Sequence, residues 1–308
     1  MQAEEIFDII IVGGGAAGLT AGIYSSRARL STLILNEGAI GGQMVLTEEI
    51  ANYPGVEKTN GYLLANTMKK QAREFGCKIK SNLKISSYEL EGEIKRIVLE
   101  DGREFSSRAV ILAPGGRPRP LQIPGEEQFK GSGISYCATC DGEFFTGKEV
   151  IVVGGGNSAL EEAVALTTYA EKVTIVHQFD HFQAFQHAID QAEMNPKIEF
   201  VMESELRSFT GNGSLQEVSM EHLPSGNSTS QNIDGVFIFA GYIPNTGDMK
   251  GIIKLNERKE ILVDQDMKTS LPGVFAAGDC IPKKYRQVTT AVADGTIASL
   301  SAAEYLRS

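Results

Sequence analysis

Two cysteines separated by two residues are the clearest chemical feature of the sequence. Cys137 and Cys140 stand in the segment CATCD. Such a pair can supply half of a zinc site or can form a redox-active disulfide. A zinc site needs two further ligands at similar spacing, and Cys77 and Cys280 stand alone in the sequence. The pair therefore favours redox chemistry, because two thiols this close can form a disulfide and nearby dipoles or cations can lower the pKa of one of them.

A glycine-rich turn near the N-terminus predicts nucleotide binding. The apolar, β-rich run Ile6–Gly18 ends in the GxGxxG pattern of Gly13, Gly15 and Gly18. In a strand–turn–helix unit the first glycine permits a tight turn, the second lets a pyrophosphate approach the backbone, and the third lets helix and strand pack closely. Amide groups at the helix N-terminus then bind the phosphates. We therefore expect a dinucleotide at this turn, namely FAD.

The elements that must position this turn occur twice in the chain. The run Gly147–Ala159 repeats the plan of the first turn about 140 residues later. Helical patterns follow at Ala16–Arg29 and Ser158–Tyr169, and strand patterns at Thr32–Asn36 and Lys172–Val176. Two βαβ beginnings in one chain imply parallel sheets. We predict an α/β fold with two Rossmann-like dinucleotide-binding domains.

Two helix-breaking stretches indicate how these domains are connected. Leu112–Gly125 holds four of the ten prolines and cannot form a helix, and Phe239–Asp248 is a second breaker. We predict that the second domain is inserted into the first. The FAD-binding domain would comprise residues 1–116 and 246–308, and the inserted nucleotide-binding-like domain, which carries the CxxC pair, residues 117–245.

Composition excludes several classes of protein. A length of 308 residues suggests about two domains. The net charge of −10 argues against a nucleic-acid partner, because such binding needs cations. No apolar run reaches the length of roughly 18 residues that a membrane span requires, and the acidic start is unlike a signal peptide. His177, His181 and His187 are too loosely spaced for a metal site. We expect a cytoplasmic protein without a bound metal or a membrane partner.

These motifs resemble those of the low-molecular-weight thioredoxin reductases, and the resemblance covers nearly the whole chain. Beside CATCD, the segments that occur in the family's order are Gly41-Gly42-Gln43, Ala51-Asn52-Tyr53-Pro54-Gly55, Ala113-Pro114-Gly115, GVFAAGDC (Gly273–Cys280) and YRQVTTAVADG (Tyr285–Gly295). The resemblance implies a flavin-dependent disulfide reductase, a homodimer, that has thioredoxin as its electron acceptor.

The resemblance also implies which residues contact FAD. Asp279 would hold the ribitol chain, and residues 286–288 would run along the isoalloxazine; an ordinary turn residue is the alternative for Asp279. Asn36 stands at the sequence position where this fold usually has the acid that binds the ribose, and Glu37 follows it. The alternative for both residues is a solvent-exposed strand end without a ligand. The expected contacts are Gly13, Gly15, Ala16, Ala17, Gly18, Asn36, Glu37, Gly42, Gln43, Asn52, Leu83, Ala113, Gly115, Gly278, Asp279, Arg286, Gln287, Val288 and Ala291.

Within CATCD the resemblance implies three roles. Cys140 faces the flavin and takes its electrons, and Cys137 is the interchange thiol that attacks the disulfide of thioredoxin, with a mixed disulfide as intermediate. Asp141 is the general acid that gives a proton to a leaving thiolate; a cap or turn residue is the alternative.

The second glycine-rich turn departs from the family. NADPH-using relatives carry His-Arg-Arg, three further residues and another Arg after the next strand, and these arginines pair with the 2′-phosphate. Here the three arginine positions are Gln178, Phe179 and Gln183. Each charge-assisted hydrogen bond is worth roughly 1.5–3 kcal/mol, so losing three weakens NADPH binding by several powers of ten.

NADH is the obvious substitute, but it requires an acid at the strand end. The position where this acid is expected is occupied by His177, and Asp180 lies three residues later. The segment is instead bulky, and Phe179, Phe182 and Phe185 would fill the adenosine groove or pack as a helix face onto their own sheet.

A flavin site and a disulfide without a recognisable clamp for NADPH resemble the ferredoxin-dependent flavin thioredoxin reductases. This resemblance implies reduced ferredoxin as the electron donor, because flavin accepts electrons singly and delivers them in pairs. Three alternatives stay open: a thioredoxin reductase that uses NADH or NADPH with altered preference, a non-enzymatic flavoprotein redox sensor, and a diflavin relative. Ferredoxins are usually acidic, so docking needs a local basic patch. Its candidate members are Arg117, Arg119, Lys283, Lys284 and Arg286.

Overall fold

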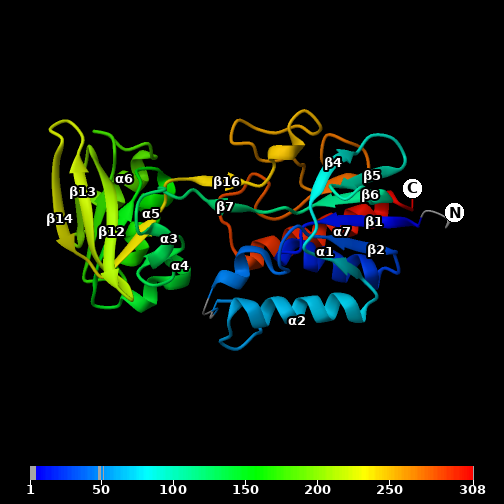
Figure 1. The fold of residues 1–308 in the computed structure, drawn as a ribbon, viewed down its shortest axis with the longest axis horizontal. Coiled ribbons are helices and arrows are strands. Elements are labelled where there is room, and N and C mark those ends of the chain that lie inside the picture. The colour runs from blue at the N-terminus through cyan, green and yellow to red at the C-terminus, as the bar shows by residue number, and fades with distance from the viewer. Residues whose placement is uncertain (1–4, 48–49, 51, 308) are drawn as a thin grey trace. The chain divides into compact units, whose positions relative to one another are not determined.

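The chain divides into two compact units. The computed structural model describes residues 5–47, 50 and 52–307. The extreme N-terminus, whose acidic sequence we discussed above, and Ala51 of the motif 51–55 lie outside these residues. Unit 1 comprises Met1–Arg117 and Ile243–Ser308, and unit 2 comprises Pro118–Tyr242 (Figure 1). The boundaries that we predicted, after residues 116 and 245, lie close to these.

Unit 1 is built on a seven-stranded sheet with the strand order β3-β2-β1-β6-β5-β4, in which β17 also pairs with β6. Its parallel strands are β1 (Ile6–Val12), β2 (Thr32–Leu35), β3 (Lys78–Lys80), β6 (Glu104–Leu112) and β17 (Val274–Ala276). β4 (Ile85–Glu89) and β5 (Lys95–Leu99) are antiparallel additions that the sequence analysis did not predict.

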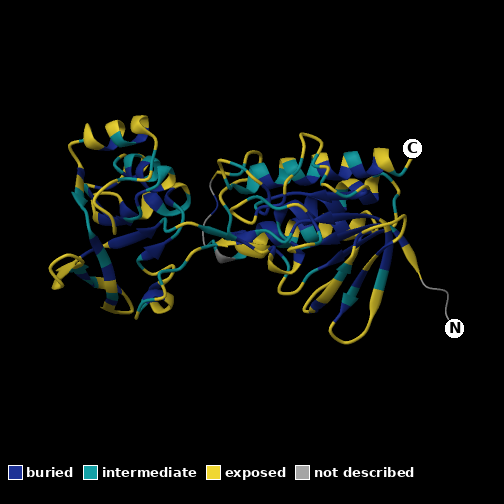
Figure 2. Cartoon of the chain, turned by 90° about the horizontal axis from the view of Figure 1, so that it is seen from above, coloured by how far each residue is buried: buried dark blue, intermediate teal, exposed yellow. Residues whose placement is uncertain are grey.

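Helices cover the parallel part of this sheet. α1 (Ala16–Arg27) packs against α2 (Gly61–Glu74) and α7 (Val288–Tyr305). The short helices η1 (Gly42–Leu46) and η3 (Gly247–Met249) lie in the connections. Both faces of β1 are apolar: Ile9 and Ile11 enter one buried cluster, and Phe7, Ile10 and Val12 enter another. This is the pattern of a parallel strand that is covered on both sides, and Figure 2 shows the buried residues gathered in the strands.

Unit 2 is built on a five-stranded parallel sheet with the order β11-β10-β9-β15-β8. Its strands are β8 (Ile134–Ser135), β9 (Glu149–Val153), β10 (Lys172–Val176), β11 (Ile198–Val201) and β15 (Gly235–Ile238). Its helices are α3 (Glu126–Phe129), α4 (Ala138–Asp141), η2 (Gly142–Phe145), α5 (Asn157–Leu166) and α6 (Gln186–Glu193). A separate antiparallel sheet of β12 (Ser204–Asn212), β13 (Ser214–His222) and β14 (Asn227–Asn232) was not predicted.

The chain passes between the units twice, in β7 (Gly116–Pro118) and in β16 (Tyr242–Pro244). These two strands form a two-stranded sheet (Figure 1). Both lie in the proline- and glycine-rich stretches that the sequence marked as breakers. Among the residues that the structure describes, no helix is long and apolar enough to span a bilayer.

Candidate flavin and disulfide sites

The expected FAD residues of unit 1 follow the ends of its parallel strands. Gly13 follows β1, Asn36 follows β2, Ala113 follows β6, and Gly278 comes two residues after the end of β17. Because these strands are parallel neighbours, their carboxyl ends meet at one edge of the sheet. Ligands of open α/β sheets bind at that edge, so the fold places these residues where a nucleotide is expected.

The first glycine turn fits a pyrophosphate. A Cβ atom built on Gly13 would lie 2.0 Å from the Ala113 carbonyl oxygen, and one on Gly18 would lie 1.9 Å from the Gly13 carbonyl oxygen. Neither position has room for a side chain, and Gly13 also has a positive φ of 107°. A Cβ on Gly15 would meet only the Gly42 Cα, at 3.9 Å. Gly13 and Gly18 thus allow close packing of the backbone, whereas Gly15 leaves space for a ligand.

Asn36 orders this turn from the end of β2. Its Oδ1 accepts a hydrogen bond from the Gly14 amide at 2.7 Å, and its Nδ2 donates to the carbonyls two and three residues later. Asn36 therefore orders the loop through its side-chain amide, and its expected contact with the ribose stays a prediction. Glu37, whose Oε1 accepts from the Ile85 amide at 3.1 Å, is the neighbouring acid. We assign the ribose contact to Glu37 as part of the proposal below.

Helix α7 brings the C-terminal part of the expected site to the glycine turn. A Cβ on Gly295 would lie 2.2 Å from the Ala17 carbonyl oxygen, and one on Gly278 would lie 2.9 Å from the Ala17 Cβ. Asn52 Nδ2 and Gln287 Oε1 are 3.5 Å apart, a long polar contact. Residues from four distant segments of unit 1 therefore lie together, as a single extended cofactor requires.

Two of the basic residues that we considered for ferredoxin docking are paired within unit 1. Lys283 forms an ion pair with Asp294, which also accepts a hydrogen bond from the Gly278 amide. Arg286 forms an ion pair with the buried Glu260. Their charge is therefore matched by these carboxylates, and neither contributes net positive charge to a docking patch.

The CxxC pair forms a disulfide in unit 2. Cys137 and Cys140 are joined, with their Cα atoms 5.3 Å apart, a separation that suits a disulfide. The pair follows β8 and spans the start of α4. No cluster of three or more His, Cys, Asp or Glu side chains that could hold a metal ion occurs within residues 5–47, 50 and 52–307. The free thiols Cys77 and Cys280 are both buried.

Hydrogen bonds of Ser135 hold the disulfide turn on the side of β8. Ser135 Oγ donates to Asp141 Oδ2 at 2.6 Å and accepts from the Cys137 amide at 3.1 Å. On the other side lies Glu162 of α5; burial raises its pKa, and the nearby Thr139 side chain opposes that rise. The sequence analysis missed Ser135. Its only signal was a serine at a strand end, two residues before the first cysteine.

The segment after β10 folds back over the second glycine turn. The Gln183 amide donates to the Gly155 carbonyl at 2.7 Å, and the Phe185 amide donates to Asn157 Oδ1 at 2.7 Å. A Cβ on Gly155 would lie only 2.3 Å from His177 Nε2, so the imidazole packs directly on the turn. His177 is 5% exposed. Burial lowers its pKa, so the ring is neutral at neutral pH and offers no charge to a phosphate.

Aromatic rings gather after β10, and one of them, Phe179, stands at a position where the family has an arginine. The ring centroids of Phe182 and Phe179 lie 5.8 Å and 5.3 Å from that of His177, and His181 stacks on Phe179 at 6.0 Å. Asp180 forms a 2.6 Å hydrogen bond with His181, which lowers the pKa of the Asp180 carboxyl. The end of β10 therefore presents aromatic surface and an acid.

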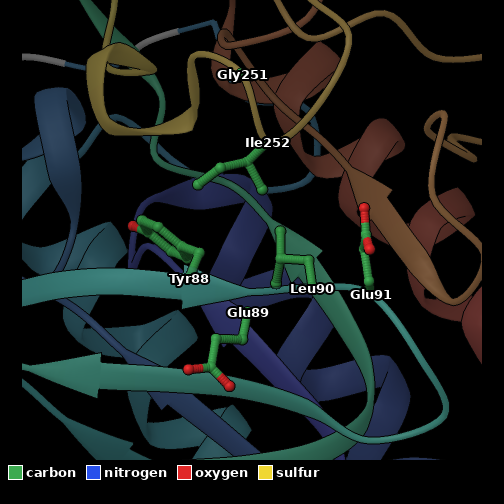
Figure 3. A pocket seen from close by; sticks show the side chains of 6 residues that line it. All are labelled: Tyr88, Glu89, Leu90, Glu91, Gly251 and Ile252. Atoms are coloured by element: carbon green, nitrogen blue, oxygen red, sulfur yellow. The ribbon is translucent and has the colours of Figure 1, made fainter.

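A shallow pocket of about 330 Å³ lies elsewhere in unit 1. Figure 3 shows Ile252 above Tyr88 and Leu90, whereas the Glu89 side chain points to the other side of its strand (Figure 3). Burial, with the nearby Glu37 carboxylate, raises the pKa of Tyr88. The pocket contains none of the residues expected to contact FAD, and we assign it no role.

Comparison with known proteins agrees with this geometry. A family model described as pyridine nucleotide-disulphide oxidoreductase matches residues 7–295. A thioredoxin reductase of Peptoclostridium acidaminophilum is 42% identical, and the match covers 98% of each chain. The crystal structure of a thioredoxin reductase from Streptococcus pyogenes has a TM-score of 0.91 at 39% identity and 99% coverage of each chain. That of a ferredoxin-flavin thioredoxin reductase from Clostridium acetobutylicum has a TM-score of 0.53 at 28% identity, again with 99% coverage.

The chain therefore belongs to the pyridine nucleotide-disulphide oxidoreductase family, and within it to the low-molecular-weight thioredoxin reductases. Proteins of this family are FAD-binding flavoproteins that act on disulfides, so the cofactor is FAD and the activity class is disulfide oxidoreductase. The predicted α/β fold with two Rossmann-like domains is confirmed.

Proposed function

We propose that this protein passes electrons from reduced ferredoxin through FAD and the Cys137–Cys140 disulfide to thioredoxin, without NADPH. Unit 1 holds FAD at the glycine turn of Gly13, Gly15 and Gly18, with Glu37 on the ribose and Asp279 on the ribitol chain. Unit 2 carries the disulfide. Bound FAD supplies the conversion of single electrons into pairs.

The observation that carries the choice of donor is the chemistry at the end of β10. Gln178, Phe179 and Gln183 replace the three arginines, and the sequence contains no lysine or arginine between Lys172 and Lys197. Phe179, which is 39% exposed, packs against the neutral His177. A 2′-phosphate placed here would lose its ion pairs. Losing three such bonds, each worth roughly 1.5–3 kcal/mol, disfavours NADPH by several powers of ten.

The chain's own residues then carry out thiol–disulfide exchange. Two electrons and two protons open the disulfide to the Cys137 and Cys140 thiols. Cys137, as thiolate, attacks the thioredoxin disulfide to form a mixed disulfide, and Asp141 gives a proton to the leaving thiolate of thioredoxin. Cys140 attacks Cys137, which restores the enzyme disulfide and releases the second thioredoxin thiol. The two protons of the enzyme dithiol end on thioredoxin.

Two comparisons bear on this proposal in opposite directions. The ferredoxin-flavin thioredoxin reductase of C. acetobutylicum matches the chain over its full length. The relative of higher identity is named a thioredoxin reductase, and Gly154 and Gly156 retain the second glycine turn. A pyridine-nucleotide enzyme with altered preference is therefore the second candidate. Asp180, an exposed acid near this turn, is the residue that would favour NADH over NADPH.

Anaerobic spectroscopy of the FAD-loaded protein tests the donor. We expect reduced ferredoxin to bleach the flavin within seconds, and NADPH or NADH at millimolar concentration to leave it oxidised. Rapid bleaching by either pyridine nucleotide would overturn the ferredoxin proposal in favour of the second candidate. Counting flavins per chain in the same sample tests the diflavin alternative, for which two would be found.

The compartment and the assembly are part of the same proposal. Cys77 and Cys280 are buried free thiols, which suits the reducing cytoplasm. We propose a cytoplasmic homodimer. Sedimentation analysis of the FAD-loaded protein measures its mass, and a value of about 67 kDa, twice the chain mass of 33.3 kDa, is expected.

A further inference from the structure

We propose that Ser135 is a positioning residue that holds Asp141 beside the exchanging cysteines and keeps its carboxylate ready to take up a proton. This inference rests on the role given to Asp141 in the proposed function, and it assigns a new residue to that step. Ser135 lies at the end of β8 and is 5% exposed, so its hydroxyl is shielded from bulk water.

The hydrogen bonds around Ser135 connect the acid to the cysteine. Its hydroxyl has one hydrogen and two acceptors in reach. Asp141 Oδ2 at 2.6 Å is much closer than the Cys137 carbonyl at 3.3 Å, so the hydrogen is directed to Asp141. The Cys137 amide donates to the same hydroxyl oxygen at 3.1 Å. The Asp141 amide donates to the Cys137 carbonyl at 3.1 Å. Side chain and backbone thus form a closed ring, which fixes the Asp141 carboxyl on the side of Cys137.

The direction of the hydrogen bond decides its chemical effect. A donor to a carboxylate stabilises the charged form and lowers the pKa of the acid. An ionised Asp141 can take the proton of the Cys137 thiol as the thiolate forms. It can then return that proton to the thiolate that leaves thioredoxin, so the proton passes from one sulfur to the other and the carboxylate is regenerated.

Other charged groups near α4 act on Asp141 in the same way in every variant. The elements packed most closely against α4 are α5 and η2. They contribute the carboxyl groups of Glu161, Glu162 and Glu143, and Lys148 follows η2. Negative neighbours raise the pKa of an acid and a cation lowers it. Because a substitution at Ser135 leaves these groups in place, the difference between variant and wild type isolates the Ser135 bond.

The test is the pH dependence of the reaction with thioredoxin. FAD-loaded enzyme is photoreduced anaerobically and mixed with oxidised thioredoxin, which makes the measurement independent of the natural donor. In wild type the rate falls at low pH as Asp141 takes up a proton. In Ser135→Ala we expect this acidic limb to move to higher pH by about one unit, because the carboxylate loses a hydrogen-bond donor. The rate at neutral pH should fall about tenfold for a separate reason, since the carboxyl is no longer held on the side of Cys137. Ser135→Thr, which keeps the hydroxyl, should restore both.

The matched control is Ser132→Ala, because Ser132 is an exposed serine of the same segment. It should leave the profile unchanged, and FAD content and flavin photoreduction should be the same in all variants. Asp141→Asn should remove the acidic limb, and Ser135→Ala added to Asp141→Asn should have no further effect. An unshifted limb in Ser135→Ala, with the limb absent in Asp141→Asn, would overturn the role of Ser135. A limb that survives in Asp141→Asn would instead overturn the role of Asp141.

A direct titration gives a reading that needs no turnover. The carboxyl carbon of Asp141 can be followed by carbon-13 NMR in the oxidised protein, with Asp141→Asn for assignment. The carboxyl should titrate about one unit higher in Ser135→Ala than in wild type. Equal titration in the two proteins would contradict the inference even if thioredoxin is not the acceptor.

Discussion

The ring of Phe179 stands 5.3 Å from the imidazole of His177, at an interplanar angle of 82°. Phe179 occupies a position where NADPH-using relatives carry an arginine. The edge-to-face contact is favourable in its own right, since such aromatic pairs contribute about 0.5–1.5 kcal/mol beyond their buried area. In the proposed function, this aromatic contact stands where a phosphate clamp would be, which the next variant tests.

Restoring the arginines should restore binding of the 2′-phosphate. The triple variant Gln178→Arg, Phe179→Arg and Gln183→Arg replaces three exposed side chains at the end of β10. We expect the Kd for NADPH to fall at least 100-fold relative to wild type, because each charge-assisted bond contributes roughly 1.5–3 kcal/mol. Calorimetric titration with NADPH, and with NADH for comparison, measures the change.

Gln191→Arg is the control for this experiment, because Gln191 is an exposed residue of α6 outside the clamp positions. It adds positive charge to unit 2 without rebuilding the clamp. NADPH affinity no better in the triple variant than in this control would show that another feature, such as the His177 ring on the turn, closes the site.

How much of this the sequence could predict depends on how local the signal is. The parallel strands and glycine turns were predictable because an apolar run followed directly by glycines carries the signal. β14 was not, because Asn227–Asn232 is polar and fully exposed and becomes a strand only by pairing with β13. The hydrogen bonds of the Asn36 side chain could not be predicted either, since their partners are fixed by the path of the loop after β2. The Ser135–Asp141 bond likewise depends on the turn between them.

The glycines of the first turn differ in the space around them, so substitutions there can distinguish an effect on FAD binding from an effect on folding. Gly15→Ala adds a methyl group where the nearest atom is 3.9 Å away, and the φ of −79° suits alanine. We expect the protein to fold, but FAD affinity to fall at least tenfold, since the methyl group occupies the space for the pyrophosphate. Flavin absorbance after purification, together with circular dichroism, measures the two effects.

Two further glycine variants complete this comparison. Gly18→Ala would place its Cβ 1.9 Å from the Gly13 carbonyl oxygen and should reduce the yield of folded protein. Gly247→Ala, in open space and far along the chain, should change neither property. Full FAD content in Gly15→Ala would mean that the cofactor does not approach this turn.

Burial sets the reactivity of the two lone cysteines. It raises the pKa of Cys77 to about 11 and that of Cys280 to about 12. Each raised value means that the thiol stays protonated in the folded protein up to alkaline pH, and the thiolate is the reactive form. After mild reduction at pH 8, iodoacetamide should modify Cys137 and Cys140 within minutes and leave Cys77 and Cys280 intact.

Peptide mass spectrometry measures this pattern. Labelling of the buried pair should rise only as the pH approaches 11, or at once when the protein is unfolded in urea. Fast modification of Cys77 at pH 8 in the folded protein would contradict its burial in unit 1.

The two cysteines of the disulfide should give different products when each is replaced. In Cys140→Ser the thiol of Cys137 can still attack thioredoxin, but no second thiol remains to resolve the mixed disulfide, so a covalent complex should accumulate. In Cys137→Ser no such complex should form. Both variants should lose at least 1,000-fold in thioredoxin reduction, because each lacks one of the two electron-carrying sulfurs. Non-reducing electrophoresis after incubation with oxidised thioredoxin measures the complex.

Cys77→Ala serves as the control for this experiment, because it removes a buried thiol of unit 1 and leaves the disulfide pair intact. If the complex accumulates in Cys137→Ser instead, the assigned roles are reversed and Cys140 is the sulfur that attacks thioredoxin.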